Sequence, residues 1–169
     1  KGVGIEGTFI LAVDREKELK KALGEDLVNR AMEFREKLSV VRDALTAIET
    51  GGVNAMHDPT EGGLAGGLNE LADASGVGFK INQDTIPIPS ETREICNYLN
   101  IDPIRTISSG SLLISVNPEK SGEVIKSLEK ESILAVEIGE VLEDEESRFI
   151  DNEVLEFPEQ DELWRIFEE

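Results

Sequence analysis

Cysteine, histidine and basic residues are scarce in this sequence. It has one cysteine, Cys96, and one histidine, and its 17 Lys and Arg residues are outnumbered by 36 Asp and Glu. A single cysteine forms no internal disulfide, so we expect a reducing, cytoplasmic environment. No His and Cys cluster has the spacing of a zinc site and no segment matches an EF-hand loop, so we predict no metal site in this chain. The net charge of −19 argues against nucleic acid as a sequence-independent partner.

Long hydrophobic runs are also missing. No apolar stretch approaches the roughly 20 residues that a membrane-spanning helix needs, and no segment resembles a signal peptide. We therefore expect no membrane partner. Acidic residues are present in excess, because residues 137–169 contain 14 Asp or Glu and only two Arg. We interpret this segment as a solvated acidic face, with a docking surface for a basic protein as the alternative.

The chain of 169 residues has the length of one domain. It begins at Lys1 without a methionine, so we expect further sequence upstream. Residues 8–13 are an apolar run typical of a buried strand. A stripe of apolar residues at spacings of three and four then predicts one long helix that ends at Gly51. The stripe consists of Leu27, Ala31, Phe34, Leu38, Val41, Leu45 and Ile48.

The second half of the chain alternates predicted helices and strands. We expect helices over residues 62–74, from Ser90 onward, over 118–130, and over 159–168 with Leu163, Trp164 and Phe167 facing inward. We expect strands over 77–81, 112–116 and 133–141, and a hairpin that pairs 149–150 with 154–155. Cys96 falls on the apolar side of its helix, which indicates a buried structural thiol. This order predicts one mixed sheet with helices on its faces.

Residues 54–68 are the most informative segment. Asp58, Pro59 and Glu61 match the N-cap, N1 and N3 positions of a capping box, so they have a purely structural interpretation. The glycines at 62, 63, 66 and 67 do not, since each glycine inside a helix costs roughly 1 kcal/mol against alanine. They indicate close approach by a ligand or by another backbone. Bare amides at such a helix start would suit an anion.

Three other features allow a functional and a structural interpretation. His57 stands just before the proposed cap, where it is a weak catalytic candidate beside Asp58. Residues 108–111 form a small-residue loop that is either a plain turn or the second side of an anion pocket. Residues 2–7 match G-x-G-x-x-G, but a dinucleotide site needs that loop after a strand. Because the loop precedes the predicted strand over 8–13, we expect a flexible entry segment and no dinucleotide site.

The chain resembles the C-terminal domain of the aminoimidazole ribonucleotide synthetase (PurM) superfamily, which includes HypE, selenophosphate synthetase and thiamine-monophosphate kinase. Its HypE-like, AIR synthase-related branch is the nearest. The residues that carry the resemblance are those at 4–8, 56–64, 68–72, 75–78, 86–88 and 109–113. The resemblance implies an α+β fold of three α/β/α layers with a mixed β-sheet, partly ferredoxin-like, in a single domain over residues 1–169.

The resemblance also implies a function. In this superfamily the Asp-Pro-Thr-x-Gly-Gly loop faces a cleft toward an N-terminal ATP-binding domain, which is absent from this chain. Residue by residue, this nominates as phosphate or substrate ligands Asp58, Thr60, Gly62 and Gly63, with Gly110 and Ser111 as the opposite lip. ATP and Mg²⁺ are implied for the full-length protein and no cofactor for this domain alone. The expected partners are the N-terminal domain, with a homodimer and a maturation-partner protein left open.

The sequence departs from HypE at three points. Glu61 stands where HypE proteins usually have Arg, and Ser109 where they usually have Glu. The chain also ends without the terminal cysteine on which HypE uses ATP to dehydrate an S-carbamoyl group. We therefore expect a HypE-like relative of hydrogenase maturation rather than HypE itself. The alternative is a non-catalytic acidic interaction module derived from the same family.

Overall fold

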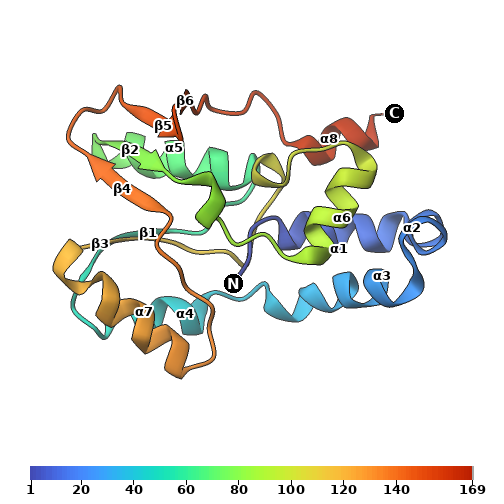
Figure 1. The fold of residues 1–169 in the computed structure, drawn as a ribbon, viewed down its shortest axis with the longest axis horizontal. Helices are drawn as coiled ribbons and strands as arrows, with labels where there is room; N and C mark the ends of the chain where they lie inside the picture. Colours follow the sequence, from blue (N-terminus) through green and yellow to red (C-terminus); the bar gives the residue numbers. More distant parts are fainter. Residues whose placement is uncertain (169) are drawn as a thin grey trace.

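The computed structural model describes residues 1–168 as a mixed α+β fold (Figure 1). Helices α1, α2, α3, α6 and α8 gather in one half of the molecule, on the right in Figure 1. The strands lie in the other half with α4, α5 and α7. The helices are α1 (Ile5–Asp14), α2 (Glu16–Leu23), α3 (Glu25–Met32), α4 (Val41–Ile48), α5 (Gly63–Ser75), α6 (Ser90–Leu99), α7 (Ser121–Lys130) and α8 (Glu162–Phe167). The strands are β1 (Val53–His57), β2 (Gly78–Ile81), β3 (Leu113–Val116), β4 (Gly139–Leu142), β5 (Arg148–Ile150) and β6 (Glu153–Val154).

The strands form two sheets. β1 and β3 pair as an antiparallel ribbon, in which His57 lies opposite Leu113. The other sheet has the order β4-β2-β5-β6, with β2 antiparallel to β4 and parallel to β5. The prediction of a mixed sheet is therefore confirmed, and the predicted hairpin forms with 149–150 paired to 153–154 in place of 154–155. The prediction of one sheet is not met, because no strand of the described residues bridges β3 and β4.

Each sheet is covered by helices through an apolar layer. α5 packs on the four-stranded sheet, and α4 and α7 pack on the ribbon. A third apolar cluster joins the helices of the other half, and each fully buried Leu or Ile in it contributes about 1.5–3 kcal/mol. The cluster of the four-stranded sheet contains Leu64, Leu68, Phe79 and Ile150. The cluster of the ribbon contains Ala47, Val124 and Leu128 with Val53 and Ile114. The cluster of the helical half contains Leu11, Leu19, Val28, Ile95 and Leu163.

Residues 8–13 are helical, so the prediction of a strand is wrong. They belong to α1, which begins after Gly4 in the left-handed conformation, with φ 71°. The Gly4 N–H donates to the Oγ of Ser108 over 2.7 Å, so the entry segment is held in place rather than flexible. Periodicity does not separate a buried strand from a buried helix in so short an apolar run. The run is apolar on most sides because α1 packs against both α3 and α6.

The long helix predicted up to residue 48 is interrupted. α3 ends at Met32 and continues as a 3₁₀ turn over Glu33–Lys37, and α4 begins only at Val41. The side-chain ammonium of Lys1 donates to the carbonyl of Lys37 and lies 3.0 Å from Asp43 Oδ2 of α4. The Lys1 side chain therefore contacts both the 3₁₀ turn and α4, where the predicted helix is interrupted. The second half of the predicted apolar stripe therefore faces solvent, with Val41 64% and Leu45 58% exposed.

Two other predictions are wrong in part. Of the strand expected over 133–141, only residues 139–141 lie in β4, which continues to Leu142. In α8, Leu163 is buried as expected, whereas Trp164 and Phe167 are about two-fifths exposed.

The prediction for Cys96 is confirmed, because the thiol is buried and burial raises its pKa to about 12. Within residues 1–168, none of the helices has the length and apolar character that crossing a membrane requires.

Candidate functional site

The loop between β1 and α5 carries the residues nominated from the sequence. Pro59 is buried, and the side chains of Asp58, Thr60 and Glu61 are exposed. The helix begins at Gly63 with Gly62 as its N-cap, and no side chain caps it. The capping-box prediction for Asp58 and Glu61 is therefore wrong. The loop folds back along the helix, because Pro59 packs against it.

The glycines of α5 allow backbone segments to approach one another. A Cβ on Gly63 would lie 2.5 Å from the carbonyl oxygen of Thr106. A Cβ on Gly67 would lie 2.9 Å from Pro59, and one on Gly66 would lie 2.9 Å from the carbonyl oxygen of Glu61. Of the two explanations that the sequence left open, close approach of another backbone therefore accounts for Gly63 and Gly66, and Gly67 makes room for the ring of Pro59.

The amides at the start of α5 are not bare. The Gly62 N–H donates to Asp161 Oδ2 over 2.7 Å, and the Gly63 N–H donates to the carbonyl of Thr60 over 3.0 Å. Asp161 is 2% exposed and also accepts from the Leu163 N–H over 2.8 Å. Burial raises the pKa of Asp161, and the nearby Glu61 raises it further. In this structure the two amides therefore already have acceptors, the Asp161 carboxylate and the Thr60 carbonyl, and the phosphate-binding role of Gly62 and Gly63 stays a prediction.

Asp161 is the residue that the sequence reasoning missed. Its position directly before the predicted closing helix is a usual N-cap signal, since Asp accepts bonds from the first amides of a helix. That signal predicts the bond to Leu163. It does not predict the bond to Gly62, which depends on how the C-terminal segment returns to the start of α5.

The loop over residues 106–111 lies against the first loop, and the role of Gly110 and Ser111 as the opposite lip of a cleft stays a prediction. The Ser108 N–H donates to the carbonyl of Thr60 over 3.3 Å. The hydroxyls point inward: Ser111 Oγ donates to the carbonyl of Gly2 over 2.7 Å and lies 2.8 Å from Ser108 Oγ. Gly110 has φ 96°, and a Cβ there would lie 3.0 Å from Leu38 Cα. Gly110 and Ser111 thus take part in the internal packing and hydrogen bonding of this loop.

His57 has a specific partner. Its Nε2 lies 2.7 Å from Oε2 of Glu70, which belongs to α5, and both side chains are partly exposed. A carboxylate at this distance orients the imidazole ring. Among residues 1–168, no cluster of His, Cys, Asp and Glu could hold a metal ion.

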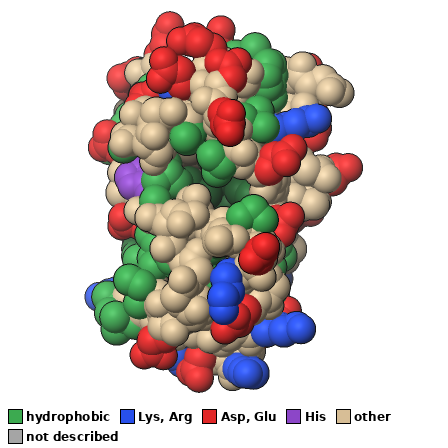
Figure 2. All heavy atoms as spheres, turned by 90° about the vertical axis from the view of Figure 1, so that its left-hand side faces the viewer, with side chains coloured by type: hydrophobic (Ala, Val, Ile, Leu, Met, Phe, Trp, Pro, Cys, Tyr) green, Lys and Arg blue, Asp and Glu red, His purple; other side chains and the backbone are tan. Residues whose placement is uncertain are grey.

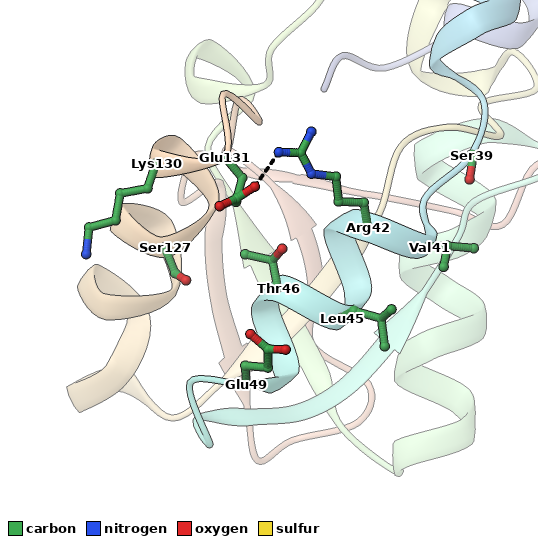
Figure 3. Close-up of a pocket in the computed structure, with 9 residues that line it drawn as sticks. All are labelled: Ser39, Val41, Arg42, Leu45, Thr46, Glu49, Ser127, Lys130 and Glu131. Carbon is green, nitrogen blue, oxygen red and sulfur yellow. Dashed lines mark hydrogen bonds and ion pairs between the residues drawn. The ribbon is translucent and has the colours of Figure 1, made fainter.

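A groove lies elsewhere, between α4 and α7, with a cavity volume of about 570 Å³ (Figure 3). Arg42 and Glu131 form an ion pair across it, and Thr46, Ser127 and Lys130 line its walls. None of the nominated site residues lines this groove. The candidate site is therefore the exposed surface of the loop over residues 57–62.

Comparison with known proteins supports the resemblance. The family described as AIR synthase related protein, C-terminal domain, matches residues 1–152. The carbamoyl dehydratase HypE of Bradyrhizobium diazoefficiens is 35% identical over 96 residues, which are 56% of this chain and 28% of that protein. The crystal structure of E. coli HypE superposes with a TM-score of 0.66 at 25% identity, over 80% of this chain and 48% of that one. A structure of the hydrogenase maturation protein HypE in complex with ATP has a TM-score of 0.52 at 25% identity, over 70% and 31%. The chain thus spans less than a third of the curated relative.

Proposed function

Because the chain belongs to the AIR synthase related family through its C-terminal domain, we propose that it is the C-terminal domain of a HypE-like, ATP-dependent enzyme of hydrogenase maturation. The active site in this proposal lies between this domain and an N-terminal ATP-binding domain in the same cytoplasmic polypeptide. The observation that carries the proposal is the loop over residues 57–62, whose polar side chains face outward while α5 and the 106–111 loop hold its backbone.

A short series of contacts connects this loop to the beginning of the chain. Ser108 accepts from the Gly4 N–H and donates its own N–H to Thr60, and Ser111 bonds to Gly2. A domain that precedes Lys1 would therefore be attached within a few residues of the loop. This placement suits a cleft in which Asp58 and Thr60 form one wall.

The charges of the loop decide which form of phosphate it can accept. Asp58 and Glu61 are exposed carboxylates, the loop itself contains no Lys or Arg, and the Gly62 amide is occupied. Two carboxylates repel a bare phosphate and suit one that arrives with Mg²⁺, since oxygen ligands are those that Mg²⁺ prefers. In the proposal Asp58 would hold Mg²⁺ or a water bound to it, and the Thr60 hydroxyl would donate to a phosphate oxygen. His57, oriented by Glu70, is the candidate for proton transfer.

Calorimetry of the polypeptide that includes the upstream domain tests the site. We expect Asp58→Asn to weaken Mg-ATP binding about tenfold or more, because a hydrogen bond to a charged group contributes about 1.5–3 kcal/mol. The matched control is Asp84→Asn, which removes an exposed carboxylate from another loop and should leave the affinity unchanged. Equal Mg-ATP affinities for Asp58→Asn and the parent protein would remove Asp58 from the site.

One observation favours a second candidate function, a non-catalytic module that binds a basic protein. Acidic side chains gather at the top of the face shown in Figure 2. Exposed acids of the C-terminal part include Glu140, Glu143, Asp144, Glu145 and Glu146. A partner retained through Asp58→Asn but released by raising NaCl to about 0.5 M, from a full-length protein that does not turn over ATP, would favour this function.

A further inference from the structure

Helix α4 presents a patch of three apolar side chains to solvent. Val41 is 64% exposed, and Leu45 and Ile48 are each 58% exposed. Their spacing of four and three residues places them in one line along the helix, as in the seam of a helix pair. A single exposed apolar residue is ordinary on a protein surface, but three in one line on a helix indicate an interaction surface.

The groove between α4 and α7 runs beside this α4 patch. Val41 and Leu45 belong to the patch and also line the groove. In Figure 3, Arg42 and Glu49 project from the side of α4 that faces α7, whereas Val41 and Leu45 project from the adjoining side. The surface around α4 therefore has ridges with a hollow between them, and a facing helix can place its side chains in such a hollow.

Opposite charges stand at the two ends of the α4 patch. Arg42 lies at its N-terminal end and Glu49 at its C-terminal end, and both side chains are exposed. In the part of the chain that the structure describes, Glu49 forms no ion pair, and Arg42 bonds to Glu131 through one nitrogen, Nη2. A guanidinium has five N–H donors, so Arg42 can still donate to a second carboxylate.

This order of charges makes the α4 patch complementary to an antiparallel copy of itself. When two α4 helices meet antiparallel about a two-fold axis beside Leu45, Leu45 contacts the same residue of the second copy. Val41 then faces Ile48 of the second copy, because the two positions lie on either side of the axis at nearly equal distances. Arg42 likewise faces Glu49 of the second copy, and the symmetry forms this ion pair twice. A parallel arrangement would instead place each of these charges beside its own kind.

The net charge of −19 restricts where two copies can meet. The copies repel each other, so a contact between them needs a surface with little net charge. α4 has one acidic and one basic residue and α7 has two of each, so both helices are neutral overall. Residues 137–169, by contrast, contain 14 Asp or Glu and two Arg. In Figure 1, α4 and α7 lie at the bottom of the molecule and β5, β6 and α8 at its top. A contact through α4 therefore keeps the acidic segments of two copies apart.

We infer that two copies of this chain associate through the α4 patch, as an antiparallel pair of α4 helices related by a two-fold axis beside Leu45. This inference goes beyond the proposed function and does not depend on it. Because the patch is small, we expect weak association, with a dissociation constant on the order of 10–100 µM. At about 1 µM the chain is then a monomer, and unfolding measured at that concentration reports on the single chain.

A cross-link between two copies tests the two-fold axis. We expect a short bismaleimide to join Leu45→Cys to its own second copy, because the axis brings the two introduced thiols together. The native Cys96 does not react, since it is buried and its pKa is raised to about 12. Val154→Cys is the matched control, because Val154 is 63% exposed and lies on β6, far from α4 in Figure 1.

The rate of cross-linking gives the comparison. Both variants are treated at about 50 µM, within the range of the expected dissociation constant, and gel electrophoresis measures the covalent dimer. We expect the dimer to form about ten times faster or more with Leu45→Cys than with Val154→Cys. Equal rates for the two variants would overturn the inference.

Exchanging the two charges distinguishes a second copy from any other partner. Glu49→Arg alone places an arginine opposite Arg42 of the second copy, and we expect it to weaken association about tenfold or more. Arg42→Glu combined with Glu49→Arg restores both ion pairs in reversed order, so we expect association to return to within about threefold of the parent chain. Sedimentation equilibrium measures the dissociation constants, and circular dichroism checks that both variants are folded. An unchanged dissociation constant in Glu49→Arg, or a double variant as weak as Glu49→Arg, would contradict the inference.

The natural, longer polypeptide shows whether the α4 patch stays open. We repeat the Leu45→Cys cross-link in it and identify the joined peptides by mass spectrometry. A link between two copies of the peptide that contains residue 45 would support the inference. If the 169-residue chain forms this link and the longer polypeptide does not, the upstream part covers α4 and the inference is overturned. Mg-ATP binding tests the proposed function separately, since the α4 patch shares no residue with the loop over residues 57–62.

Discussion

Asp161 connects the C-terminal segment to the candidate site through one carboxylate. It lies beyond the residues that match the family, yet it accepts hydrogen bonds from Gly62 and Leu163. Among the residues that the structure describes, no Lys or Arg forms an ion pair with it. Hydrogen bonds from backbone amides therefore offset only part of the cost of burying its charge, and the pKa of Asp161 stays above its ordinary value. The conformation of the site loop consequently depends on the C-terminal segment as well as on α5.

The glycine at the start of α5 gives a prediction at the scale of one residue. Gly63→Ala should lower the free energy of unfolding by roughly 3 kcal/mol or more. The alanine would have to adopt a left-handed backbone conformation, and its Cβ would clash with the carbonyl oxygen of Thr106. Gly76→Ala is the matched control, since Gly76 has φ 63° against 60° for Gly63, and nothing lies within 4 Å of its added Cβ. Gly76→Ala should lower the free energy of unfolding by only about 1 kcal/mol. Urea unfolding measures both, and equal losses would show that the packing against Thr106 is not tight.

At the scale of the element, α4 is unusual because its buried face is small and its exposed face is apolar. Ala47 and Asp43 face inward, whereas Val41, Leu45 and Ile48 are each more than half exposed. Asp43 forms an ion pair with the Lys1 side chain, and Ala47 packs with Val124 and Leu128 of α7. A hydrophobic period identifies the apolar side of a helix, but tertiary contacts such as these decide which side turns toward the core.

Truncation variants check this orientation. Leu45→Ala should change the free energy of unfolding of this chain by less than about 0.5 kcal/mol, as expected for an exposed site. Ile95→Ala, at a fully buried position of α6, should cost about 2–5 kcal/mol. Thermal or urea unfolding of the two variants gives the comparison. A loss at Leu45 as large as that at Ile95 would mean that the stripe is part of the core after all.

At the scale of the whole molecule, the charge is strongly unbalanced. Seventeen basic residues face 36 acidic ones, and the ion pairs are mostly between exposed side chains. Exposed pairs contribute little, about 0–1 kcal/mol each. The self-repulsion of the excess acid therefore lowers the stability of the compact state.

Salt should accordingly stabilise this chain. Raising NaCl from about 0.02 M to about 0.3 M shortens the screening length from roughly 20 Å to about 6 Å. We expect the melting temperature to rise by several degrees, and calorimetric or circular-dichroism melting curves measure the shift. The same concentration of a non-ionic osmolyte controls for solvent effects that do not depend on charge. A melting temperature that falls with NaCl would mean that the ion pairs outweigh the repulsion.

The sequence by itself determined the fold class, the family and most helices and strands of the second half, because capping residues, prolines and apolar periods act over a few neighbours. It also indicated that the glycines of α5 allow a close approach. Only the tertiary structure decided what approaches them, that residues 8–13 are helical, that α4 turns its stripe outward, and that Asp161 occupies the Gly62 amide. Each of these depends on contacts between residues tens of positions apart in the chain, such as Thr106 with Gly63 or Lys1 with Asp43, and local periodicity carries no information about such contacts.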